Sequence, residues 1–175
     1  MFLDHPDEWE WLTPLPMAKS IIRALDATQL AVRELLPHVP VSAAAAPRAC
    51  EGGVLSAAAA AAHVLVEGFV SIGVSKRAGM SYFAAALDKR VVAFITYGYD
   101  VLNVVPNLQH MHDSLGGWPI LLKFNSEYNI SQRLHSNEYR KMAEAIDPYT
   151  LIDRMDMPKL LISASNDEFF LIDDS

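Results

Sequence analysis

Residues 64–87 read VLVEGFVSIGVSKRAGMSYFAAAL, and this stretch decides the fold. Residues 64–72 form an apolar run of the length typical of a buried strand, and residues 77–87 have the composition of a helix. Ser75 lies at the break between the two. A tight strand-to-helix turn lifts a serine Oγ above the sheet and presents backbone N–H groups beside it. The position therefore predicts a candidate nucleophile.

The residues around Ser75 match only half of the G-x-S-x-G pattern that a nucleophile turn favours. Small residues are needed there because the strand and the helix come into van der Waals contact. Gly73 meets this need two positions before the serine, whereas Arg77 does not meet it two positions after. The alternative interpretation is a serine that caps a helix, which is a common role in any α/β protein.

Two further apolar runs extend this unit into a sheet. Residues 91–97 and 159–165 are expected to be buried strands, and the helix at 77–87 crosses over between the first two strands. Such a βαβ unit has parallel strands and a right-handed crossover. The sequence therefore predicts an α/β fold with a mostly parallel sheet and flanking helices.

The segments outside these strands give less complete predictions. An apolar stripe over residues 17–35 predicts an amphipathic helix that starts at Pro16 and ends by Pro37. A second helix is expected at 137–145 and a short helix or turn at 149–157. Residues 1–15 read as a loop, and residues 98–132 as a long irregular region that carries function or short helices.

The composition of residues 1–175 is that of a single globular domain, with 51% hydrophobic and 20% charged residues. Residues 42–62 are an alanine-rich, low-complexity insert. The net charge of −7 and the lack of a basic stripe argue against a nucleic-acid partner. The single cysteine, Cys50, excludes a disulfide framework and a cysteine-based zinc site. No signal peptide is recognisable, and the apolar run at 54–66 is too short to span a membrane.

Chain order predicts the acid and the base of a serine site. Asp167 follows the third strand and lies after Ser75, as the order serine, acid, histidine requires, and it would orient the histidine. Glu168 is a weaker candidate for this role, and a solvated turn is the alternative for both. No histidine follows Asp167. Either the base lies outside this sequence, or the site is inactive, or a histidine of the middle region folds back: His110, His112 or His135.

Two other chemistries have candidates in the sequence. His110 and His112 form a His-x-His pattern that would put two imidazoles on one side of a strand, but no third ligand has suitable spacing and a polar loop is favoured. Lys76 and Arg77 could attract an anionic group. Buried ion pairs with acids of the middle region are the slightly favoured interpretation of these two cations. The sequence predicts no metal ion and no cofactor.

Several short motifs, taken in order along the chain, resemble those of one protein family. They are Leu15-Pro16-Met17-Ala18-Lys19-Ser20, Gly73-Val74-Ser75-Lys76-Arg77, Leu87-Asp88-Lys89-Arg90-Val91, Asp100-Val101-Leu102-Asn103, Gly116-Gly117-Trp118-Pro119, Asp147-Pro148-Tyr149, Met157-Pro158-Lys159-Leu160 and Asn166-Asp167-Glu168-Phe169-Phe170. On these residues the sequence is similar to the PhoPQ-activated pathogenicity-related protein family, which includes the autocrine proliferation repressor proteins. The resemblance covers roughly the whole chain except the alanine-rich insert.

The resemblance implies an α/β-hydrolase fold with Ser75 as the nucleophile, the N–H of Lys76 as an oxyanion donor and Asp167 as the acid. The implied reaction is hydrolysis of an ester or amide, in a small-molecule or peptide substrate, through an acyl-serine. Two departures, Val74 for a small residue and Ala78 for glycine, predict a crowded turn.

Members of the family are also much longer, with early strands before the segment at residue 15 and a histidine-bearing segment after Asp167. The chain is therefore expected to be a partial α/β-hydrolase domain that is inactive as it stands. The repressor branch of the family implies the alternative function, a secreted regulatory protein without catalysis.

Overall fold

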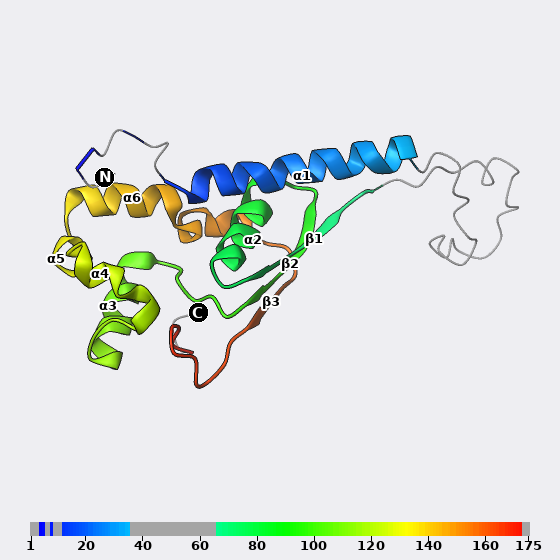
Figure 1. The fold of residues 1–175 in the computed structure, drawn as a ribbon. Helices are drawn as coiled ribbons and strands as arrows, with labels where there is room; N and C mark the ends of the chain where they lie inside the picture. The colour runs from blue at the N-terminus through cyan, green and yellow to red at the C-terminus, as the bar shows by residue number, and fades with distance from the viewer. Residues whose placement is uncertain (1–3, 6–7, 9–11, 36–65, 173–175) are drawn as a thin grey trace, which may run out of the picture.

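The computed structural model describes residues 4–5, 8, 12–35 and 66–172. The alanine-rich insert predicted at 42–62 lies outside these ranges. Three strands, β1 (Phe69–Val74), β2 (Val91–Tyr97) and β3 (Lys159–Ile162), form one parallel sheet in the order β1-β2-β3. Helices flank this sheet (Figure 1), which confirms the predicted α/β fold.

The helices form two groups (Figure 1). The first group comprises α1 (Pro14–Leu35), α2 (Lys76–Leu87) and the 3₁₀ segment η4 (Pro148–Arg154), in which α2 contacts the other two. The second group comprises α3 (Val104–Leu115), η3 (Ile120–Leu122), α4 (Phe124–Glu127), α5 (Ile130–Arg133) and α6 (Asn137–Ile146). None of the helices described combines the length and the hydrophobicity that crossing a bilayer requires.

One face of the sheet packs on α2 because that helix presents small residues to it. Ala84, Ala85 and Ala86 are buried in one apolar cluster with Phe94 of β2. The ring of Tyr82 meets the ring of Phe94 edge-on, with centroids 5.1 Å apart. These contacts fix β2 beneath α2 and so position the carboxyl ends of the strands.

The strands differ from their predicted bounds and burial. β2 matches the prediction, whereas β1 begins at Phe69 and reaches Val74, and β3 stops at Ile162. Residues 64 and 65 lie outside the described ranges. The prediction that all three strands are buried is wrong, because every residue of β3 is exposed and β1 alternates exposed positions with less exposed ones. A continuous apolar run predicts cover on both faces, and the described helices supply it on only one.

The region expected to be irregular, residues 98–132, contains α3 and three short helical segments. α3 begins where it does because the carboxylate of Asp147 accepts a hydrogen bond of 2.7 Å from the N–H of Val104. Asp147 also accepts a bond of 2.9 Å from the N–H of Tyr149, so a single side chain caps α3 and η4. Burial raises the pKa of Asp147.

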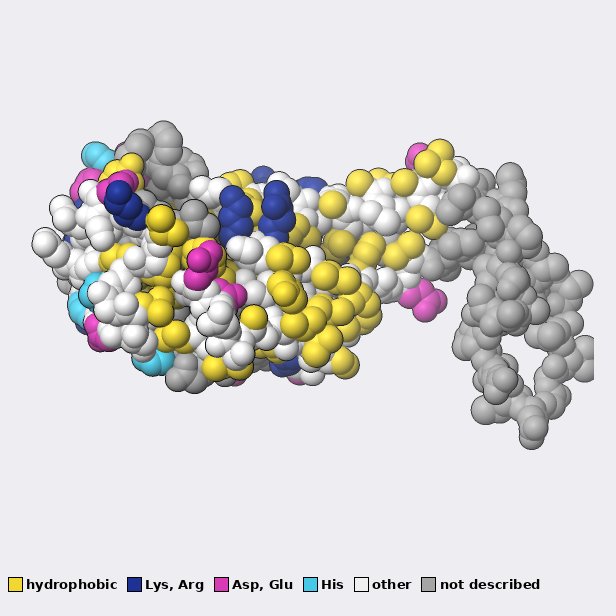
Figure 2. All heavy atoms as spheres, turned by 60° about the horizontal axis from the view of Figure 1, so that its bottom comes forward, with side chains coloured by type: hydrophobic (Ala, Val, Ile, Leu, Met, Phe, Trp, Pro, Cys, Tyr) yellow, Lys and Arg dark blue, Asp and Glu magenta, His cyan; other side chains and the backbone are white. Residues whose placement is uncertain are grey.

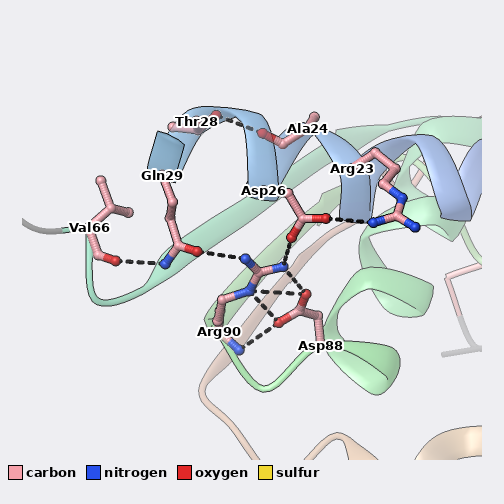
Figure 3. A network of polar contacts seen from close by, with 8 residues as sticks. All are labelled: Arg23, Ala24, Asp26, Thr28, Gln29, Val66, Asp88 and Arg90. Carbon is pink, nitrogen blue, oxygen red and sulfur yellow. Dashed lines mark hydrogen bonds and ion pairs between the residues drawn. The ribbon is translucent and has the colours of Figure 1, made fainter. Parts of the chain in front are cut away.

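A network centred on Arg90 ties α1 to the start of β2 (Figure 3). Its Nη2 lies 2.8 Å from an oxygen of Asp26 and 2.6 Å from one of Asp88, and its Nη1 donates to Gln29 over 2.7 Å. The hydrogen bonds from Arg90 lower the pKa of both carboxyl groups. Gln29 in turn donates to the carbonyl of Val66 over 2.9 Å, just before β1.

Candidate active site

Ser75 stands directly between β1 and α2 in a strained backbone conformation, with φ 53° and ψ −137°. A positive φ is uncommon for a residue with a side chain and costs on the order of 1–3 kcal/mol, so it persists only where its surroundings impose it. The N–H of Ser75 donates to the carbonyl of Tyr97 over 2.9 Å, which ties the turn to β2. The side chain makes no capping hydrogen bond to α2, which contradicts the alternative role as a helix cap.

The turn is possible because β1 and α2 approach each other closely at Gly73. A Cβ at Gly73 would lie 2.4 Å from the carbonyl oxygen of Arg77 and 2.6 Å from the Cα of Ala78. The small residue is therefore needed three positions after the serine, where Ala78 is completely buried, whereas the side chain of Arg77 is exposed. Val74 also points outward and is 57% exposed, so its bulk stays out of the crossing.

The start of α2 offers backbone donors beside Ser75. The first N–H groups of a helix have no partner within it, and the helix dipole gives this end a partial positive charge. The N–H of Lys76 is the first of these donors, whereas that of Ala78 is already bonded to the carbonyl of Ser75 over 2.7 Å. Lys76 and Arg77 are exposed, and no acid in the described ranges forms a salt bridge with either, so the ion pairs predicted for them are not present there.

Asp167 lies at the same edge of the sheet, in the turn after β3. Its Oδ1 accepts hydrogen bonds from the N–H groups of Phe169 and Phe170, over 2.8 and 3.2 Å. Its Oδ2 faces Gly98 after β2, where an added Cβ would lie 3.8 Å away. One oxygen thus fixes the carboxylate, and the other has no hydrogen bond from any described residue. The side chain of Glu168 beside it is exposed.

Tyr99 connects the elements of this edge, and no sequence pattern indicates its role. Its ring lies 5.9 Å from that of Phe170 and 6.2 Å from that of Tyr82, between centroids. A Cβ at Gly79 in the first half of α2 would lie 2.8 Å from the Tyr99 hydroxyl, so a glycine is needed there. Burial raises the pKa of the Tyr99 hydroxyl, which stays protonated at neutral pH.

The three histidines of the middle region make no hydrogen bond to Ser75. His112 lies on α3 with its Nδ1 3.3 Å from Asp113 and its ring 5.1 Å from that of Trp118, and the exposed His110 and His135 make no hydrogen bond to Ser75. Because the His-x-His pattern lies on a helix, its two side chains point about 160° apart rather than to one side. Within the described ranges no three potential ligands cluster as a metal site would require.

A family model described as PhoPQ-activated pathogenicity-related protein matches residues 32–175. Autocrine proliferation repressor protein A of Dictyostelium discoideum is 28% identical over 172 residues, which cover 98% of this chain and 29% of the relative. The chain therefore spans less than a third of that relative's length. No solved structure matches it.

Proposed function

The chain belongs to the PhoPQ-activated pathogenicity-related protein family, and we propose that Ser75 is the nucleophile of an acyl-transfer site in this fold. The observation that carries the proposal is the strained conformation of Ser75, with φ 53° and ψ −137°, at an exposed strand-to-helix turn. Strain of this kind is concentrated at active sites because it orients a reactive side chain. A helix cap would explain the strain only if the hydroxyl bonded to α2, and it does not.

In the proposed reaction, the Oγ of Ser75 attacks the carbonyl carbon of an ester or amide in a small-molecule or peptide substrate. The carbonyl π electrons move to oxygen, and the N–H of Lys76 donates to this oxyanion. The base that takes the serine proton passes it to the leaving oxygen or nitrogen, so that collapse of the intermediate expels the alcohol or amine. An acyl-serine remains, which water then hydrolyses. The exposed cations Lys76 and Arg77 add positive potential at the point where negative charge develops.

The proton of Ser75 needs a base, and Asp167 is the residue that would orient it. Its Oδ1 is held by two backbone N–H groups, which leaves Oδ2 to accept a hydrogen bond from an imidazole. No histidine follows Asp167 in the sequence, and Ser75 has no hydrogen bond to a histidine in the described ranges. The polypeptide of residues 1–175 is therefore expected not to turn over by itself.

Labelling with a fluorophosphonate probe tests the nucleophile and the absence of its base together. The 175-residue protein should stay unlabelled in buffer, and added imidazole, acting as an external base, should raise labelling by on the order of tenfold or more. Ser75→Ala should abolish the imidazole-dependent signal, whereas Ser114→Ala, an exposed serine on α3, should retain it.

One result would count against the absence of the base, and two would count against Ser75 as the nucleophile. Strong labelling without imidazole, lost in Ser75→Ala, would show that the base is already present. Labelling that survives Ser75→Ala would assign the reactivity to another residue. No labelling at any imidazole concentration would remove Ser75 as a nucleophile.

A second candidate function is a regulatory protein that keeps the scaffold without the chemistry. It is favoured by the name of the relative from Dictyostelium discoideum, an autocrine proliferation repressor, and by a Ser75 without a described base. The labelling experiment separates the two candidates. Imidazole-dependent labelling supports the nucleophile, and complete inertness favours the regulator, since fold alone does not choose between them.

A further inference from the structure

The sheet has a second face, here called the outer face, which points away from α2. Phe94 and Thr96 of β2 lie on the covered side with Tyr82 of α2, so their alternating neighbours Ala93, Ile95 and Tyr97 point outward. The strand register places matching positions of β1 and β3 beside them. The outer face is thus made of eight apolar residues: Val70, Ile72, Val74, Ala93, Ile95, Tyr97, Leu160 and Ile162.

The outer face carries no charged side chain, yet much of it is accessible to solvent. Ile72 is 68% exposed and Leu160 is 53% exposed, whereas Phe94 on the covered side is 1% exposed. Hydrophobic side chains gather over this part of the molecule, with the charged groups lying around it (Figure 2). Parallel sheets are found almost only with both faces covered, because their strands are apolar on both sides. A face of this kind marks a docking surface.

The topology indicates what kind of segment would cover it. Crossovers between parallel strands are right-handed, so two crossovers that step in one direction across the sheet fall on the same face. The steps from β1 to β2 and from β2 to β3 follow this rule, and α2 contacts η4 on that one face. A helix reaches the outer face when its crossover steps in the opposite direction, to a strand along the free edge of β1.

We propose that the outer face binds an amphipathic α-helix belonging to the longer polypeptide of this family, whose apolar stripe packs across Ile72, Ile95 and Leu160. The matched part of the relative is 29% of its length, so that protein has ample chain to supply such a helix. The central position of Ile72, Ile95 and Leu160, each on a different strand, suits a helix laid over all three strands. This inference does not depend on Ser75 being a nucleophile.

Binding of a designed helix to the 175-residue protein tests the proposal. The probe is a fluorescent 18-residue peptide with a leucine stripe and equal numbers of lysine and glutamate, and its control is the same composition in scrambled order. Fluorescence anisotropy should show binding of the amphipathic peptide and not of the scrambled one. Ile72→Glu and, independently, Leu160→Glu should weaken binding at least tenfold, because each would bury a charge without a partner.

Leu30→Glu is the matched control, since Leu30 is a similarly exposed leucine on α1, 57% accessible, and is not one of the eight outer-face residues. It should bind the peptide as the unmodified protein does, and circular dichroism should show all three variants folded. Equal binding by Ile72→Glu would overturn the proposal. So would a dimer in analytical ultracentrifugation that excludes the peptide and is abolished by Ile72→Glu, because the occupant would then be a second copy of this chain.

Discussion

Gly73→Ala tests the close approach of β1 and α2 that shapes the turn at Ser75. The added Cβ would lie 2.4 Å from the carbonyl oxygen of Arg77, and ordinary contacts begin at 3.4 Å, so strand and helix would have to separate by about 1 Å. The obstacle is backbone, which no rotamer change relieves. We expect a loss of about 3 kcal/mol in the free energy of unfolding, at the upper end of the cost of overpacking.

Urea denaturation followed by circular dichroism at 222 nm measures this loss, and two other glycines provide controls. A Cβ at Gly68 would meet the side chain of Val92 at 2.8 Å, which can rotate, so Gly68→Ala should cost about half as much. At Gly116, with φ +69° and no atom within 4 Å, only the left-handed conformation is penalised, by about 1 kcal/mol. A cost for Gly73→Ala no greater than that for Gly116→Ala would refute the reasoning.

Three further predictions concern strain, charge and capping. Ser75→Gly should be about 1 kcal/mol more stable than Ser75→Ala in urea denaturation, because glycine adopts a positive φ without strain, and an equal stability would argue against a strained turn. Arg90→Gln should lower the free energy of unfolding at pH 7 and should make this free energy fall less steeply between about pH 5 and pH 2. Arg90 lowers the pKa values of Asp26 and Asp88, so the two carboxylates stabilise the fold above their ordinary pKa of 3.8. This stabilisation is lost as the pH falls through the lowered pKa values. A pH profile parallel to that of the unmodified protein would contradict this. Asp147→Ala should cost about 2 kcal/mol in the same denaturation assay by removing the caps of α3 and η4, with Asp147→Asn less costly, and equal losses would show that capping is not the cause.

Local patterns predicted most of the elements. The apolar run at 91–97 matches β2 residue for residue, and the helices at 77–87 and 137–145 differ from α2 and α6 by one residue each. These predictions succeed because hydrophobic periodicity and helix-ending residues act over a few neighbours in the chain. The position of Ser75 between a strand and a helix was predicted for the same reason, as was the place of Asp167 after the third strand.

Contacts between distant residues decided the features that the patterns missed. The start of α3 depends on Asp147, which lies 43 residues away from Val104 in the sequence. Tyr99 contacts α2 at Gly79 and the turn after β3 at Phe170, and no pattern of neighbouring residues predicts either contact. Long-range partners of this kind are fixed by the packing of whole elements, so no window of neighbouring residues reveals them.

The sequence by itself determined that this protein has parallel strands joined by a helix, with a serine at the turn. The hydrophobic periodicities that distinguish strands from helices are properties of consecutive residues. Only the tertiary structure decided that the serine is strained and that none of the described helices covers the outer face of the sheet. The strained turn at Ser75 lies where Gly73 closely approaches Ala78, and the exposure of Ile72 goes with both crossovers lying on the other side of the sheet. Both follow from how the elements are placed in space, which the order of residues does not show.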